Sequence, residues 1–214
     1  MRQVGIRILG IGWMLVVVGC LPFRQSTGPV HYYRLGCPTE NRVKVHREKS
    51  AFRGCLLIVR PRVAAYLNRP GLAIRRGDQG VVYTENHRWA EPVEDGLHRL
   101  LRECLSRRLG TEHILIGSYP VAPSNCWELQ IVVDQFEIDE HGVAYLAGTW
   151  TLLRGADREV LMTVPFHFQS SFSYHPSDLS PAVQALAQDV VKLSNQISEK
   201  LFQWLRRPSN GSSS

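Results

Sequence analysis

The sequence predicts an α/β protein: a single three-layer domain with a mixed sheet and two long helices, in which the C-terminal part of the sheet is an antiparallel meander. Three observations support this class. Two stretches repeat apolar residues at helical spacing, one continuous apolar run is typical of a strand buried on both faces, and three consecutive stretches alternate apolar and polar residues. With 44% hydrophobic and 21% charged residues in a chain of 214, there is enough apolar material for one ordinary core.

The first half of the chain contains short strands separated by polar connections. These strands are expected at residues 30–35, 55–59, 72–74 and 81–83. The run at 55–59 is continuously apolar, which indicates a strand covered on both faces. A glycine-rich turn at Gly77–Gly80 predicts that the last two strands form a hairpin. Residues 36–54 are expected to be a long basic loop, and residues 64–70 a connection.

Two amphipathic helices are predicted. The first opens at Glu91–Pro92, has acidic residues in its first turn and ends at Gly110, where a left-handed residue commonly closes a helix. Its apolar stripe includes Cys104. The second starts at Ser180–Pro181 and carries an apolar stripe as far as Trp204. Each stripe needs a sheet or another helix to cover it.

The meander is predicted between the two helices, after a short strand at residues 114–116. Its three strands are expected at residues 127–138, 143–153 and 160–168. In the first of them the apolar parity changes after Val133, which indicates a β-bulge near Asp134–Gln135.

The N-terminus predicts export and lipid anchoring. Arg2 and Arg7 precede an uncharged apolar run that is too short to span a bilayer as a helix but fits the core of a signal peptide. The run ends at Val-Val-Gly-Cys, a bacterial lipobox ending in Cys20. We therefore predict a signal peptide at 1–19, a lipidated N-terminus and tether at 20–29, a domain at 30–206 and a polar tail at 207–214. The alternative is a buried N-terminal element in which Cys20 is incidental.

Lipidation at Cys20 would fix the mature chain to a membrane, because each buried CH₂ of an acyl chain such as palmitate contributes about 0.8 kcal/mol. Residue 21 is Leu rather than Asp, which by the enterobacterial sorting rule predicts the outer membrane, facing the periplasm. Loss of the leader lowers the formal net charge from +6 to +4. This small and scattered excess does not indicate a nucleic-acid partner.

Of the five cysteines, four remain after lipidation: Cys37, Cys55, Cys104 and Cys126. An even number in an oxidising compartment permits disulfides in three pairings. However, Cys104 lies on the apolar face of the first helix and Cys55 begins a buried strand, so buried free thiols are an equal alternative. No Cys-x-x-Cys is present, which argues against a zinc or redox site.

The sequence contains no recognisable catalytic constellation. A phosphate-binding glycine loop, a serine nucleophile elbow and a His-Glu-x-x-His helix are all missing. His167 and His175 lack nearby carboxylates, so no metal site is expected. Glu85, His87 and Glu91 could form an acid–base cluster around Trp89. The preferred interpretation is structural, with Trp89 wedged between a strand and the first helix. We therefore expect neither an enzyme nor a cofactor.

Three short stretches, in order along the chain, carry a family resemblance. They read Tyr-Tyr-Arg-Leu at 32–35, Ala-Tyr-Leu-Asn-Arg-Pro at 65–70 and Arg-Trp-Ala-Glu-Pro at 88–92. Together they resemble the ABC-type transport auxiliary lipoproteins, the paraquat-inducible protein C family, over nearly the whole mature chain. The matching residues, expected to be structural or to contact a partner, are Tyr66, Leu67, Arg69, Pro70, Arg88, Trp89, Ala90, Glu91 and Pro92.

The resemblance implies a non-catalytic, lipid-anchored periplasmic accessory subunit of an ABC-type transport system. Such systems move lipids or hydrophobic compounds across the envelope and support membrane integrity. The implied partners are a periplasmic protein with the lipid-binding domain named for mammalian cell entry and its inner-membrane permease. Homo-oligomeric assembly is also implied. The alternatives are an envelope structural or assembly lipoprotein unrelated to transport and, with less support, a periplasmic hydrolase.

Overall fold

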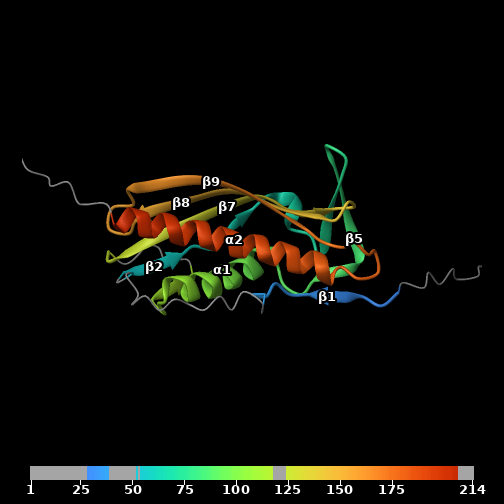
Figure 1. Ribbon diagram of the computed structural model, residues 1–214, viewed down its shortest axis with the longest axis horizontal. Helices are drawn as coiled ribbons and strands as arrows, with labels where there is room; N and C mark the ends of the chain where they lie inside the picture. Colours follow the sequence, from blue (N-terminus) through green and yellow to red (C-terminus); the bar gives the residue numbers. More distant parts are fainter. Residues whose placement is uncertain (1–27, 39–51, 53, 118–123, 207–214) are drawn as a thin grey trace, which may run out of the picture.

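The computed structural model describes residues 28–38, 52, 54–117 and 124–206, and it confirms the predicted α/β class (Figure 1). The expected signal peptide, the lipidated Cys20, the tether as far as residue 27 and the tail 207–214 lie outside the described residues. Most of the predicted loop 36–54 does so too. In the described part, no helix combines the length and hydropathy that crossing a membrane requires.

The strands of the described ranges form one nine-stranded mixed sheet. They are β1 (His31–Tyr33), β2 (Cys55–Ile58), β3 (Arg62–Val63), β4 (Gly71–Arg76), β5 (Gly80–Trp89), β6 (Ile114–Ile116), β7 (Cys126–Asp139), β8 (Val143–Arg154) and β9 (Val160–Ser171). Along one path the order is β1-β5-β4-β7-β2-β6. Strands β7, β8 and β9 form the predicted antiparallel meander, whereas β2, β3 and β4 pair with β7 in parallel.

Strand β7 is the centre of the sheet, because it pairs with β8 along one edge and with three shorter strands along the other. Its register with β8 shifts between Val133 and Gln135, which confirms the predicted bulge. The extra residue keeps Phe136 and Ile138 on the buried side that Val133 already occupies. It also turns Glu137 to the opposite face of the sheet.

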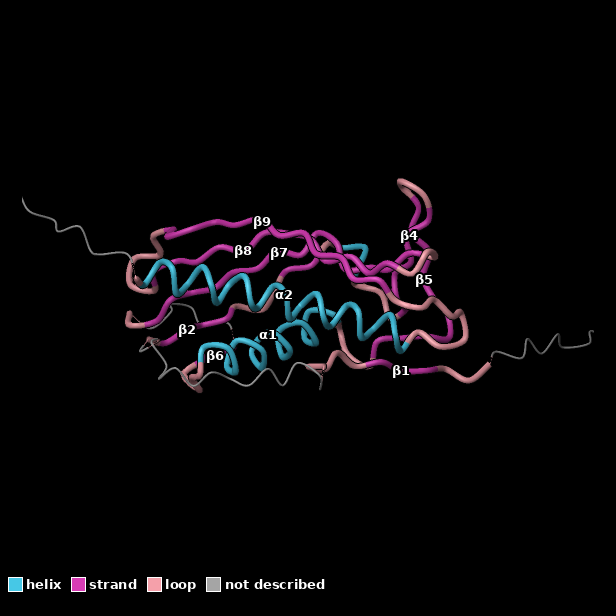
Figure 2. Tube along the Cα trace, viewed as in Figure 1, coloured by secondary structure: helices cyan, strands magenta, loops and turns pink. Residues whose placement is uncertain are grey.

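The β4–β5 hairpin projects from the body of the molecule (Figure 2). The hairpin was predicted, but β5 is much longer than the expected 81–83 and runs on to Trp89. Polar residues after Tyr83 obscured the strand pattern. The pairing register shifts between Gly71 and Ala73, opposite these polar residues, and there the Thr84 hydroxyl accepts the Leu72 N–H at 2.9 Å.

Two long helices complete the domain: α1 (Val93–Leu109) and α2 (Ser180–Leu205). Helix α1 ends at Gly110, which has a φ of 62°, as predicted for a left-handed C-terminal residue. Helix α2 packs on β7, β8 and β9 and also on α1, so the sheet, α2 and α1 form the layers seen in Figure 1. The main core lies between these layers.

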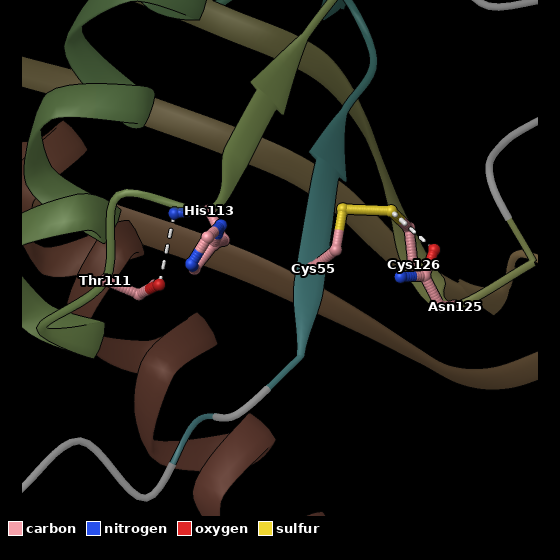
Figure 3. The surroundings of a disulfide bond; sticks show 5 residues. All are labelled: Cys55, Thr111, His113, Asn125 and Cys126. Carbon is pink, nitrogen blue, oxygen red and sulfur yellow. Dashed lines mark hydrogen bonds between the residues drawn. A yellow bond between two sulfur atoms is a disulfide. The ribbon is translucent and has the colours of Figure 1, made fainter.

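A disulfide joins Cys55 and Cys126 (Figure 3). Cys37 and Cys104 are free. Cys55 begins β2 and Cys126 begins β7, and the two residues are opposite each other in the parallel pairing, with Cα atoms 4.3 Å apart. The structure thus selects one of the pairings that the sequence left open. Cys104 is a buried free thiol, as the alternative interpretation of the sequence allowed.

Candidate functional site

The three motif stretches, which are far apart in the sequence, meet in the structure around one pocket of about 430 Å³. The second and third stretches provide most of its lining, and the first stretch is hydrogen-bonded to the third. The lining residues are Leu67, Asn68, Arg69, Pro70, Trp89, Ala90, Glu91, Pro92 and Val93. Two of the predicted residues, Tyr66 and Arg88, lie beside the pocket rather than in its lining. Cys20 lies outside the described residues.

One wall is the connection after β3, which folds into a short 3₁₀ turn, η2 (Ala65–Leu67). Its backbone is tied to the sheet, because the Ala64 N–H donates to the Val133 carbonyl at 2.9 Å. The Tyr66 hydroxyl donates to Glu137 Oε2 at 2.9 Å, and the Tyr83 hydroxyl donates to the Tyr66 carbonyl at 2.9 Å. These bonds hold the turn in place, while Leu67 is buried in the pocket floor.

The carboxylate of Glu137 holds this wall in place by accepting the hydrogen bond from Tyr66. It is 4% exposed, and Arg75 binds its Oε1 at 2.6 Å. Arg75 also lies over the ring of Tyr145, 4.2 Å from the centroid. Burial, together with the hydrogen bond to Glu137, raises the pKa of Tyr66 well above its usual range. Tyr66 therefore keeps its proton and acts as a fixed donor.

The opposite wall is the junction between β5 and α1. The Trp89 N–H donates to the Pro70 carbonyl at 2.7 Å, so the two walls are joined directly by their backbones. The Trp89 indole is half-buried and stacks on Phe136, with ring centroids 5.9 Å apart. Trp89 thus lies between strand and helix as predicted, although it is itself the last residue of β5.

The first motif stretch fixes this junction from the other side. The Tyr33 carbonyl accepts the Ala90 N–H at 2.8 Å, and the Leu35 carbonyl accepts a hydrogen bond from Arg99 at 2.8 Å. Arg99 also binds Glu91, and Arg34 lies 4.0 Å from the same carboxylate oxygen. Glu91 is therefore occupied by two arginines from two different elements.

Among the described residues around the pocket, His87 and Glu91 are both engaged in other contacts. Both ring nitrogens of His87 are engaged, with the Tyr33 hydroxyl at 2.8 Å and the Pro176 carbonyl at 3.0 Å. Glu91 is held by arginines, and Glu85 is exposed. Within the described residues, no group of three or more His, Cys, Asp or Glu could hold a metal ion. In the cluster that the sequence suggested around Trp89, His87 and Glu91 thus make structural contacts, whereas Glu85 is exposed.

Outside the pocket, a buried carboxylate on α2 is also held by neighbours. Asp189 is 0% exposed, and its Oδ1 accepts hydrogen bonds from Ser170 at 2.7 Å and Lys192 at 2.8 Å. Burial raises the pKa of Asp189 in spite of these donors, which act in the opposite direction. Through Ser170 on β9, this carboxylate joins α2 to the sheet.

Residues 33–198 match the family described as the ABC-type transport auxiliary lipoprotein component. The chain belongs to this family. The match begins at Tyr33 of the first motif and includes every residue of the pocket, so the site is part of the auxiliary lipoprotein domain itself.

Solved structures show the same fold at low sequence identity. A crystal structure of an uncharacterised protein is 22% identical, has a TM-score of 0.65, and the match covers 81% of this chain and 99% of that one. A DUF330 family protein from Xanthomonas campestris is 15% identical, has a TM-score of 0.67, and the match covers 86% and 100%. No curated protein sequence matches the auxiliary lipoprotein.

Trp89→Ala should lower the free energy of unfolding of the auxiliary lipoprotein by about 3 kcal/mol, at the low end of the cost of truncating a core aromatic residue. The reason is loss of the stack on Phe136 and of the contact between strand and helix. Denaturant titration measures the effect, with Trp89→Phe as a control that keeps an aromatic stack. A variant that stays fully stable yet loses function would make Trp89 a contact residue instead.

Proposed function

We propose that this protein is a non-catalytic, lipid-anchored accessory subunit of an envelope transport system, and that it acts by docking to a partner. The partner would be the periplasmic protein with the cell-entry-type domain, working with an inner-membrane permease to move lipids or hydrophobic compounds. The observation that carries the proposal is the convergence of all three family motifs on one pocket. The family membership supports the transport context.

Docking suits the chemistry of the pocket better than turnover does. Its floor is apolar, and His87 and Glu91 are both committed to structural bonds. A compact domain of about 100 residues has a radius of gyration of only roughly 13 Å, so an anchored protein of this size needs a partner to bridge the periplasm. The apolar floor with a charged rim is the usual composition of a small recognition site.

Anchoring at Cys20 is part of the proposal, with the outer membrane, facing the periplasm, as the expected location. Cys20→Ser should leave an uncleaved precursor without acyl chains, because the thiol is the group that accepts the diacylglyceryl moiety. Metabolic labelling with a fatty-acid probe measures acylation, and Cys37→Ser is the matched control that should still be labelled. Persistent acylation of Cys20→Ser would contradict the anchor assignment.

Gentle solubilisation and pull-down of the tagged lipoprotein tests docking. We expect the cell-entry-domain protein to co-purify with several copies of the lipoprotein. Ala90→Trp should reduce this recovery by filling the pocket mouth. Ala156→Trp is the matched control, because Ala156 is also exposed but lies in the turn between β8 and β9. Recovery of peptidoglycan or assembly proteins instead would favour the structural alternative. A lone monomer with hydrolytic activity would overturn the docking proposal.

A further inference from the structure

We infer that the pocket binds a short peptide segment of the partner, in which apolar side chains are flanked by carboxylates. This inference rests on the proposed docking function and names the chemistry that the pocket recognises. It follows from the size of the pocket, from the placement of its exposed walls and from the charges on its rim. Each of these is a property of the residues that join η2 to β4 and β5 to α1.

The size and shape favour side chains of a peptide. A volume of about 430 Å³ lies at the small end of ligand pockets, which span roughly 300–1,000 Å³. Leu67 and Val93 are buried at the floor and Trp89 is half-buried, whereas the rim residues Arg69 and Pro92 are exposed. A long acyl chain in such an open site would remain partly in water. One or two apolar side chains would fill it and leave a peptide backbone along the rim.

Among the described residues, the rim carries one arginine, Arg69, that is not paired with a carboxylate. Glu91 is neutralised by Arg99 and Arg34. Farther along the first turn of α1, Glu94 and Asp95 both pair with Arg60, at 3.3 Å and 2.9 Å. Arg69 lines the pocket, is exposed, and pairs with no carboxylate among the described residues. These contacts set four arginines (Arg34, Arg60, Arg69 and Arg99) against three carboxylates (Glu91, Glu94 and Asp95). The excess charge is therefore positive, which selects an acidic segment and steers its approach.

Selection of random octapeptides on the detergent-solubilised full-length protein tests this inference. Wild type should enrich sequences with Leu, Ile, Phe or Pro next to Asp or Glu. Arg69→Glu should lose this enrichment or shift it to Lys and Arg. The matched control is Arg62→Glu, because Arg62 is also exposed but lies on β3 outside the pocket lining. Fluorescence anisotropy of the most enriched peptide should show about tenfold weaker binding to Arg69→Glu and no change for Arg62→Glu.

Three results would overturn the inference. They are enrichment that Arg69→Glu does not alter, the lack of any enrichment, and binding of phosphatidylglycerol vesicles that depends on Arg69 when peptides do not bind. In each case, recovery of the partner protein with wild type in the pull-down would still support the docking function. Failure of both experiments would remove the function together with the pocket assignment.

A separate observation concerns the two free cysteines. Cys104 lies on α1, Cys37 lies in the segment after β1, and their sulfur atoms are 3.8 Å apart. Arg107, one turn along α1, donates a hydrogen bond to Cys37 Sγ at 3.1 Å and so holds the segment against the helix. The structure assigns this pair as the site of a second disulfide, which would fasten the first motif stretch to α1.

The reaction is a thiol–disulfide exchange with the disulfide of a protein thiol oxidoreductase. The S–H bonds of both cysteines break and one S–S bond forms, while the oxidoreductase disulfide accepts two electrons and two protons and becomes two thiols. Burial and the neighbouring Cys37 raise the pKa of the Cys104 thiol to about 12. The half-exposed Cys37 is thus the sulfur that forms the mixed disulfide first, and Cys104 then displaces the oxidoreductase.

Tryptic mapping without reduction of the full-length protein isolated from membranes tests the assignment. Cleavage produces residues 35–42 with Cys37 and residues 103–107 with Cys104, and the disulfide links these two peptides at two hydrogens less than their summed mass. The Cys55–Cys126 link is the internal control for oxidation. Oxidised wild type should also melt about 5–10 °C above Cys37→Ala, because the link closes a long loop. Alkylation of both Cys37 and Cys104 in protein whose Cys55–Cys126 link is intact would overturn the assignment.

Discussion

Trp150→Ala is expected to lower the free energy of unfolding by about 3–5 kcal/mol, a large part of the roughly 5–15 kcal/mol typical of a domain. Trp150 is 1% exposed and is the largest fully buried side chain among the described residues. It lies on β8 and faces α2, where its Nε1–H donates to Gln196 Oε1 at 3.0 Å. Truncation would leave a cavity in the main core between the sheet and α2.

Denaturant unfolding of wild type, Trp150→Ala and Trp150→Phe separates the two contributions. Phenylalanine keeps most of the packing but loses the donor to Gln196, whose net value is about 1 kcal/mol. We expect Trp150→Phe to lie between the other two proteins. Unfolding midpoints that coincide for Trp150→Ala and wild type would mean that α2 does not pack on β8 as the structure places it.

Much of the fold could be predicted from the sequence because local patterns determine it. The bulge near Asp134 was visible as a change of apolar parity, and Gly110 marked the end of α1 before the structure placed it at positive φ. Strand β5 was too short in the prediction, because alternation fails where the pairing register shifts opposite Thr84. Strand β3, two residues long, is too short to leave a periodic signal.

The site was predictable only in part. The motif stretches were found in the sequence, but no spacing rule indicates that Pro70 and Trp89 share a backbone hydrogen bond across a hairpin. The bond between Glu137 and Tyr66 could not be predicted either. The face of the sheet on which Glu137 lies depends on the bulge between Val133 and Gln135. The disulfide partner of Cys55 depends on which strand lies beside β2, and that is decided by the tertiary fold.

Removal of the Cys55–Cys126 disulfide should also lower the free energy of unfolding by a large amount. We expect the double variant Cys55→Ala/Cys126→Ala to lose about 2–5 kcal/mol of unfolding free energy under oxidising conditions. The two cysteines are 71 residues apart, so the bond closes a long loop and restricts the unfolded chain strongly. It also fixes the register between β2 and β7 at the edge where both strands begin.

A thiol reductant provides the decisive comparison, because wild type then loses the same cross-link during unfolding. The difference between wild type and the double variant should shrink to the small cost of replacing two cysteine side chains, of which Cys126 is buried. If the difference persists in reductant, packing around Cys126 rather than the cross-link stabilises this edge of the sheet. If no difference appears under either condition, the start of β2 does not hold β7, and the parallel pairing there contributes little to the stability of the fold.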